Sequence, residues 1–308
     1  MSICPSCSYL GRFAPSPTGP LHFGSLVAAA GSYFDARAHG GHWLLRMEDL
    51  DTPRCIPGAA DSILRTLEQF GFEWDAKPVW QSQRSDAYQT ALDQLIDIGQ
   101  AFPCACTRRE LADAPRAADG SRIYPGTCRH GLPPGRQARA WRVRAHEGCV
   151  TFRDLIQGNQ REELAREVGD FIVRRADGLF AYQLAVVIDD ADAGITHVVR
   201  GADLLSSTCR QIHLQKILGY QTPQYAHLPV ATNEAGEKLS KQTLADAVDD
   251  YPAPQALVLA LQFLNQSPPP ELARASIAEI HAWACHNWHR ESVAAQLSQP
   301  APTLPTSP

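Results

Sequence analysis

The sequence predicts an α/β fold organised around a parallel sheet, and two observations lead to this prediction. Apolar strand-like segments, polar loops and helical segments alternate over roughly the first hundred residues. The second observation is the loop RFAPSPTGPLHFGS, residues 12–25, which lies between an apolar start and a helical run at residues 26–38. Its three prolines and two glycines are typical of a loop that holds a ligand against its backbone.

The next predicted elements follow in chain order. WLLRMEDLD, residues 43–51, is expected to form a strand that ends in acidic residues. Two amphipathic helices are expected within residues 56–72 and 85–99, the first ended by Gly71 and the second capped by Ser85. Their apolar faces are formed by Ile63, Leu64, Leu67 and Phe70, and by Tyr88, Leu92, Leu95 and Ile96.

The pattern changes over residues 102–144, where prolines, glycines, arginines and cysteines dominate, which predicts an insertion. Regular structure then returns. We expect a tight turn at Asp177–Gly178, a buried strand at residues 184–188 and a strand that runs into a loop at residues 195–205. Two amphipathic helices, residues 254–266 and 276–288, precede a proline-rich tail that is expected to be disordered.

Composition excludes several classes of protein. Of the 308 residues 44% are hydrophobic and 20% are charged, and no apolar run reaches the length of a membrane span. The N-terminus lacks the pattern of a secretory signal, and nine scattered cysteines argue against a disulfide framework, so we expect a cytoplasmic protein. The net charge of -5 gives no global attraction to nucleic acid. Residues 129–144, with five arginines, are either a local RNA contact or, as we favour, a solvated strand edge.

Ligands bind beyond the carboxyl ends of strands in open α/β sheets. Three segments are expected to converge there: the opening loop, the acidic residues after Met47 and the loop after Val199. A fourth segment, EKLSKQ at residues 237–242, carries two lysines that suit a triphosphate.

These segments together resemble the glutamyl-tRNA synthetase family of class I aminoacyl-tRNA synthetases. The resemblance rests on PSPTGPLHFGS, RMEDLD, VVRGADL and KLSKQ in this order, and runs from about residue 10 to about residue 265. The family's H-I-G-H and K-M-S-K-S signatures correspond to residues 22–25 (HFGS) and 238–242 (KLSKQ). The implied fold is a Rossmann-like class I catalytic domain.

Only 67 residues follow Lys241 in the 308-residue chain, too few for the anticodon-binding domain of a full synthetase of this family. The chain therefore resembles a truncated branch of the family. Members of that branch activate L-glutamate with ATP in the absence of tRNA and attach it to queuosine at the wobble position of tRNA(Asp). The expected partners are thus ATP, L-glutamate and tRNA(Asp) carrying queuosine, with the protein acting as a monomeric ligase.

The resemblance also implies roles for individual residues. The residues implied for L-glutamate are Arg12, Phe13, Ala14, Pro15, Ser16, Glu48, Tyr182 and Arg200. Those implied for ATP are His22, Gly24, Ser25 and Lys241, with His22, Lys238 and Lys241 catalytic and Mg²⁺ bound to the phosphates. Guanidinium groups suit carboxylates, but the sequence leaves open which arginine binds which carboxylate of glutamate. Without the resemblance, a surface salt bridge for Arg12 or Glu48, a core position for Tyr182 and a helix cap for His22 would be ordinary alternatives.

Three cysteines of the insertion, Cys104, Cys106 and Cys128, can share one structural Zn²⁺ or be buried free thiols. Chemistry alone favours His130 as the fourth ligand, whereas the family resemblance implies Tyr124, which we prefer. Cys4 and Cys7 have metal-like spacing, but no strand precedes them, so we assign them no role. The remaining cysteines, Cys55, Cys149, Cys209 and Cys285, are expected to be structural thiols.

The predicted organisation has six parts. They are a flexible N-terminus (1–10), the two halves of the catalytic domain (11–101 and 166–245), a zinc-bearing insertion between them (102–165), a short helical region (246–290) and the disordered tail (291–308). Three other functions stay open: a minimal glutamyl-tRNA synthetase charging the 3′ end of tRNA(Glu), a nucleotidylyltransferase with a small acceptor, and an RNA-binding module with a decayed site.

Overall fold

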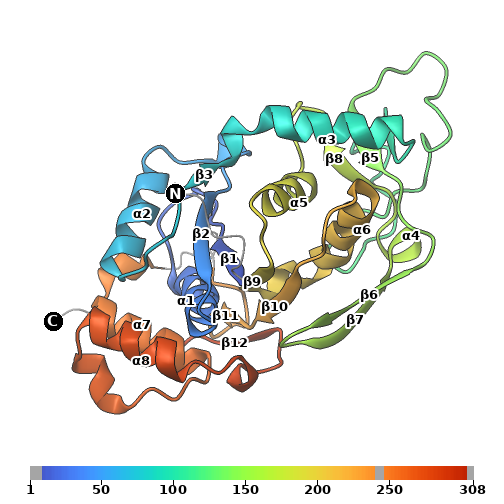
Figure 1. Cartoon of the computed structure of the whole chain (residues 1–308). Helices are drawn as coiled ribbons and strands as arrows, with labels where there is room; N and C mark the ends of the chain where they lie inside the picture. The colour runs from blue at the N-terminus through green and yellow to red at the C-terminus, as the bar shows by residue number, and fades with distance from the viewer. Residues whose placement is uncertain (1–8, 240–245, 304–308) are drawn as a thin grey trace.

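The computed structural model describes residues 9–239 and 246–303 (Figure 1). A parallel sheet lies at its centre, built from two hydrogen-bonded groups of strands. One group is β1 (Leu10–Phe13), β2 (His42–Met47) and β3 (Val79–Trp80), and the other is β9 (His197–Gly201), β10 (Gln224–Leu228) and β6 (Cys149–Asp154). The Thr196 amide donates to the Leu10 carbonyl at 3.0 Å, which places β9 beside β1. The carboxyl ends of these strands therefore meet at one edge, as predicted.

Helices cover both faces of this sheet. On one face α1 (Phe23–Ala38) packs against α7 (Ala253–Phe263) and α8 (Ile277–Asn287), and α2 (Ala59–Gln69) contributes to the same apolar cluster. On the other face α3 (Ser85–Asp97), α5 (Tyr182–Asp192) and α6 (Thr208–Leu218) enclose a second cluster. Gly31 lets α1 approach the sheet closely, because a Cβ there would lie 2.5 Å from Leu228. The four helices expected at residues 56–72, 85–99, 254–266 and 276–288 are confirmed.

The insertion has its own small sheet. Strands β4 (Ala101–Cys104), β5 (Ala140–Val143) and β8 (Phe171–Arg174) pair antiparallel, and the expected turn at Asp177–Gly178 follows β8. The expectation of a solvated strand edge is wrong, because β5 is the central strand and Arg142 is buried, donating to the Asp170 carbonyl at 2.7 Å. β6 and its antiparallel partner β7 (Gly158–Glu163) lie within the predicted insertion, yet β6 pairs with β10 of the central sheet. The short helix α4 (Leu164–Glu167) follows β7.

Three further expectations require correction. Residues 184–188 were expected to form a strand but belong to helix α5, because a short apolar run cannot distinguish a buried strand from a buried helix. Ser85 does not cap α3; the N-cap residue is Arg84, whose side chain instead pairs with Asp189 and Asp192. The tail is expected to lack structure, but β12 (Ser298–Pro300) pairs with β11 (Val230–Thr232), and its proline lies on an edge strand, where a missing N–H is tolerated.

Within residues 9–239 and 246–303, none of the helices combines the length and the apolar character that crossing a bilayer requires.

Candidate active site and cysteine cluster

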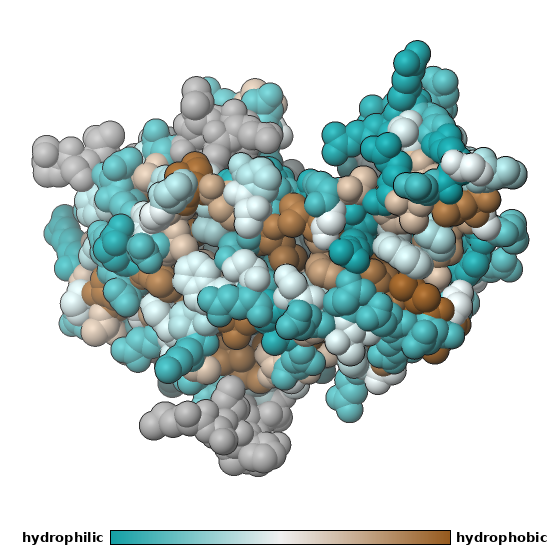
Figure 2. All heavy atoms as spheres, turned by 90° about the horizontal axis from the view of Figure 1, so that it is seen from above, coloured by the Kyte–Doolittle hydropathy of each residue, from teal (hydrophilic) through white to brown (hydrophobic). Residues whose placement is uncertain are grey.

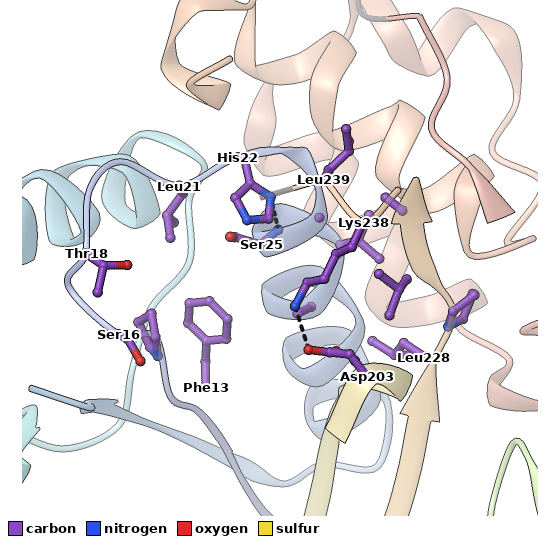
Figure 3. A pocket seen from close by; sticks show the side chains of 18 of the residues that line it. Phe13, Ser16, Thr18, Leu21, His22, Ser25, Asp203, Leu228, Lys238 and Leu239 are labelled. Carbon is purple, nitrogen blue, oxygen red and sulfur yellow. Dashed lines mark hydrogen bonds and ion pairs between the residues drawn. The ribbon is translucent and has the colours of Figure 1, made fainter. Parts of the chain in front are cut away.

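A cavity of about 720 Å³ opens at the carboxyl edge of the sheet (Figure 3). The opening loop forms one wall, through Phe13, Pro15 and Ser16, and continues into the first turn of α1. The opposite wall comes from the end of β9, from β11 and from the segment before residue 240. The stretch predicted for glutamate and the stretch predicted for ATP therefore lie beside a common cavity, although Ala14 of the first stretch is half-buried and does not line it.

His22 is the N-cap residue of α1 and lines this cavity with Gly24 and Ser25. Its Nδ1 accepts from the Ser25 amide at 3.3 Å, so in the neutral ring the proton lies on Nε2. A Cβ on Gly24 would lie 3.2 Å from the imidazole ring. Gly24 thus leaves room for the His22 ring at the positively polarised helix N-terminus, where phosphate binding is favoured. His22 can therefore cap helix α1 and still fulfil the role in ATP binding that the family resemblance implies.

Lys238 reaches into the cavity from the opposite wall (Figure 3). Its Nζ lies 2.5 Å from Asp203 Oδ2, and about half of its side chain is exposed to solvent. Lys241, the other predicted lysine, lies outside the described residues, as do Cys4 and Cys7.

The four other residues predicted to bind glutamate come from four elements. Arg12 is on β1, Glu48 follows β2, Tyr182 begins α5 and Arg200 is on β9. Burial raises the pKa of the Tyr182 hydroxyl, and the charges of the other three residues also act on it. Burial likewise raises the pKa of Glu48, against the charges of Arg46 and Arg12. The fold therefore brings all four side chains into one electrostatic cluster.

Arg12 is held by a buried ion-pair network that the sequence did not reveal. Its Nε lies 3.2 Å from Asp190 Oδ1, and Arg46 reaches the same oxygen at 2.6 Å. Arg46 also donates to Glu48 at 3.3 Å. Burial opposes the charge of Asp190, but the two arginines outweigh it and lower the pKa of this carboxyl. Since Asp190 lies on α5, it could have been found only after that segment was recognised as a helix.

Arg200 is held differently, by neutral groups. Its Nε donates to His227 Nε2 at 3.0 Å, and its terminal nitrogens donate to Thr208 Oγ1 at 2.9 Å and to the Tyr182 hydroxyl at 3.4 Å. The other ring nitrogen of His227 contacts Asp154 Oδ2 at 2.6 Å. Burial lowers the pKa of His227 to about 4, so the ring is neutral near pH 7. The imidazole then donates to Asp154 and accepts from Arg200.

The three cysteines of the insertion lie together. Their sulfur atoms are within 4.8 Å of one another, and no histidine or carboxylate of the described residues joins this group. The Tyr124 hydroxyl lies 3.5 Å from Cys104 Sγ and 3.6 Å from Cys106 Sγ. His130, in contrast, is exposed. A set of three thiols, two buried and one half-buried, could hold a metal, and soft sulfur ligands fit zinc.

The surroundings of Cys104 also suit a thiolate. Burial opposes its ionisation, but the hydrogen bond shared with Tyr124 and the one that Arg142 Nε donates at 3.4 Å lower the pKa of this thiol. Cys55, Cys149, Cys209 and Cys285 are free thiols.

Known proteins resemble this chain in both sequence and fold. A family model described as the catalytic domain of class I tRNA synthetases (E and Q) matches residues 10–264. A glutamyl-Q tRNA(Asp) synthetase of Aromatoleum aromaticum is 67% identical over 96% of this chain and 93% of its own. One of Dechloromonas aromatica is 61% identical over 94% of this chain and 96% of its own.

A solved structure supports the same assignment. The glutamate-tRNA synthetase of Elizabethkingia anophelis superposes with a TM-score of 0.78 at 25% identity, over 94% of this chain and 67% of its own. The chain therefore belongs to the class I tRNA synthetase family of the glutamate and glutamine enzymes, in the branch of the glutamyl-Q tRNA(Asp) synthetases.

Proposed function

We propose that this chain is an ATP-dependent ligase that activates L-glutamate without tRNA and transfers it to queuosine at the wobble position of tRNA(Asp). The observation that carries the proposal is the junction of two half-sites. The loop that lines the cavity at the N-terminus of α1 starts at Arg12. Arg12 in turn belongs to a cluster with Glu48, Tyr182 and Arg200. Both ATP and tRNA are cytoplasmic molecules, and we place the reaction there.

In the first step a carboxylate oxygen of glutamate attacks the α-phosphorus of ATP, and the bond to pyrophosphate breaks. Glutamyl-adenylate and pyrophosphate are the products. We assign the glutamate carboxylates to Arg12 and Arg200 and the ammonium group to Glu48. His22 Nε2, the amides of the first turn of α1, Lys238 and Lys241 would stabilise the charge that develops on the phosphates. Mg²⁺, bound to the phosphate oxygens, would supply further charge neutralisation.

In the second step a hydroxyl of queuosine attacks the acyl carbon of the adenylate. An ester forms, AMP leaves, and the hydroxyl proton is released. The names of the close relatives favour this acceptor over the 3′ end of tRNA(Glu).

Two measurements test the proposal. Glutamate-dependent exchange of pyrophosphate into ATP, without tRNA, is expected from the purified protein. Labelled glutamate is then expected on the wobble nucleotide of tRNA(Asp) after nuclease mapping. Absence of exchange would refute the activation step, whereas label on a 3′-terminal adenosine would refute the acceptor.

We further propose that Cys104, Cys106, Tyr124 and Cys128 bind one structural Zn²⁺ per chain. The proximity of the phenol to the sulfurs supports Tyr124 as the fourth ligand over His130. Elemental analysis is expected to give one zinc per chain in the wild type. Tyr124→Phe is expected to weaken zinc retention against a chelator, and His130→Ala to leave it unchanged. The reverse result would assign the ligand to His130.

A further inference from the structure

A second cavity, of about 530 Å³, lies between the insertion and the catalytic half of the chain. The insertion contributes one wall, including Arg108, Ala112 and Arg122, and the starts of β8 and α5 together with α6 contribute the other. None of its lining residues lines the cavity proposed for ATP. Its volume is within the range of about 300–1,000 Å³ that is typical of small-molecule sites.

The lining combines an apolar surface with convergent polar groups. Leu111, Val168, Phe171 and Ile172 supply the apolar part. Gln183, which is half-buried, and Arg210, which is buried, supply hydrogen-bonding groups, while Arg108 and Arg122 are exposed. A flat heterocycle needs apolar contact for its faces and polar contact for its edges, and a nucleotide strand needs cations for its phosphates.

Arg210 indicates that the cavity is built to receive a polar ligand. The residue is only 6% exposed, and one terminal nitrogen donates to Asp119 of the insertion and to the Ser206 carbonyl. Its Nε is buried, and no acceptor among the described residues meets it. A buried N–H group without an acceptor is costly, so a ligand oxygen or nitrogen at this position would be stabilising.

The cavity is connected to the glutamate cluster through the first turn of α5. Tyr182 contacts Arg200 in that cluster, and the next residue, Gln183, lines the second cavity. Gln183 is held in place, because it donates to Ser207 Oγ at 2.9 Å and accepts from Gln211 at 2.9 Å. The second cavity and the glutamate cluster therefore draw on consecutive residues of one helix turn.

Charge distribution supports an RNA ligand. Residues 102–144 contain nine arginines and three acidic residues, although the whole chain has a net charge of -5. Figure 2 shows that the lobe on the right of the view, where Figure 1 places the insertion, is covered mainly by hydrophilic side chains. The side chain of Arg108 has no ion-pair partner among residues 9–239 and 246–303.

We propose that this second cavity receives the acceptor nucleoside of the RNA substrate, with Arg108 and Arg122 contacting the flanking phosphates. The inference rests on the proposed function and assigns the acceptor to a place in the fold. Filling the cavity should block transfer of glutamate and leave its activation intact.

Ala112→Trp tests this, because Ala112 is exposed and lines the cavity, so that the indole can fill it without disturbing the core. We expect kcat/KM for transfer to queuosine-containing tRNA to fall at least tenfold, since stacking of a base is worth about that much or more. Pyrophosphate exchange should stay within about twofold of wild type. Ala138→Trp is the matched control, because Ala138 is also an exposed alanine of the insertion but lines neither cavity.

Arg108→Ala gives a second readout. We expect weaker tRNA binding. We also expect the slope of log K against the logarithm of the salt concentration to become shallower by about one, as for loss of one phosphate contact. If the wild type transfers glutamate and Ala112→Trp transfers it equally well, the cavity is not the acceptor site, although the proposed function stands. A wild type without exchange activity would instead overturn the proposed function itself.

Discussion

Asp154 determines which ring nitrogen of His227 carries the proton, and Asp154→Asn should move that proton and remove the hydrogen bond from Arg200 to His227. Asp154 Oδ1 accepts from the backbone amides of Ile156, Gln157 and His227 at 3.0, 2.8 and 3.1 Å, and an asparagine Oδ1 can keep these bonds. The new amide group, however, would face the ring nitrogen that now donates to Asp154. The imidazole must then accept from Asn and carry its proton on Nε2, which places a donor opposite Arg200 Nε.

The expected loss follows from the hydrogen bond that disappears. Arg200 Nε and His227 Nε2 are 3.0 Å apart in a buried site, and a hydrogen bond to a charged group contributes about 1.5–3 kcal/mol. We therefore expect the KM for glutamate in pyrophosphate exchange to rise about ten- to hundredfold, with the KM for ATP changed less than about twofold. Thr208→Val, which removes one other acceptor of Arg200, should raise the glutamate KM only several-fold.

Asp75→Asn is the control for a general structural effect. Asp75 also accepts from a backbone amide, that of Trp43 at 2.7 Å, and pairs with Arg37, but it touches none of the residues proposed for glutamate. A correctly folded Asp154→Asn protein with an unchanged glutamate KM would contradict the role of the Asp154–His227 pair. An equal rise in the KM of both substrates would also contradict it.

Three further predictions concern the phosphates, the cysteines and acid stability. Lys238→Met should lower the exchange kcat at least tenfold, because it removes a cation from the ATP cavity, and an unaltered kcat would leave Lys238 without a catalytic role. Cys128→Ser should abolish zinc in elemental analysis and lower transfer more than exchange; equal losses would show that the insertion also supports activation. His227 should destabilise the fold in acid, since its folded pKa is about 4 and an unfolded histidine near 6.5 takes up its proton first. Stability is thus lost as the pH falls between these values, by about 3 kcal/mol, and equal urea midpoints at about pH 7 and about pH 5 would refute this.

The parts of the site that could be predicted are those carried by local sequence. His22, Gly24 and Ser25 lie where the opening loop enters helix α1, and their positions at the cavity proposed for ATP follow from the order of loop and helix. The cysteines Cys104 and Cys128 could be grouped because an irregular, cysteine-rich segment has few other ways to become ordered.

The supporting residues could not be predicted, for a physical reason. Asp154 and His227 are separated by 73 residues and meet only because β6 pairs with β10 in the central sheet. No local pattern encodes that pairing. Asp190 was missed because its segment was interpreted as a strand, whereas in α5 it reaches both Arg12 and Arg46.

The predicted insertion therefore consists of two parts with different roles. Its later part, β6, contributes Asp154, which contacts the His227 ring that holds Arg200. The two ends of its earlier part, residues 105–139, are held together by the pairing of β4 with β5. In this pairing Cys104 lies opposite Ala140, and the Arg139 amide donates to the Cys104 carbonyl at 2.9 Å. A two-residue Asn-Gly turn in place of residues 105–139 should preserve that ladder.

This excision removes most of the cysteine cluster and one wall of the second cavity but leaves β6 in place. We expect the excised protein to retain glutamate-dependent pyrophosphate exchange within about tenfold of wild type and to lose detectable transfer to tRNA. Circular dichroism and the urea midpoint establish that the remainder is folded. A folded protein without exchange would show that activation depends on residues 105–139, and one that still transfers glutamate would place the acceptor outside the second cavity.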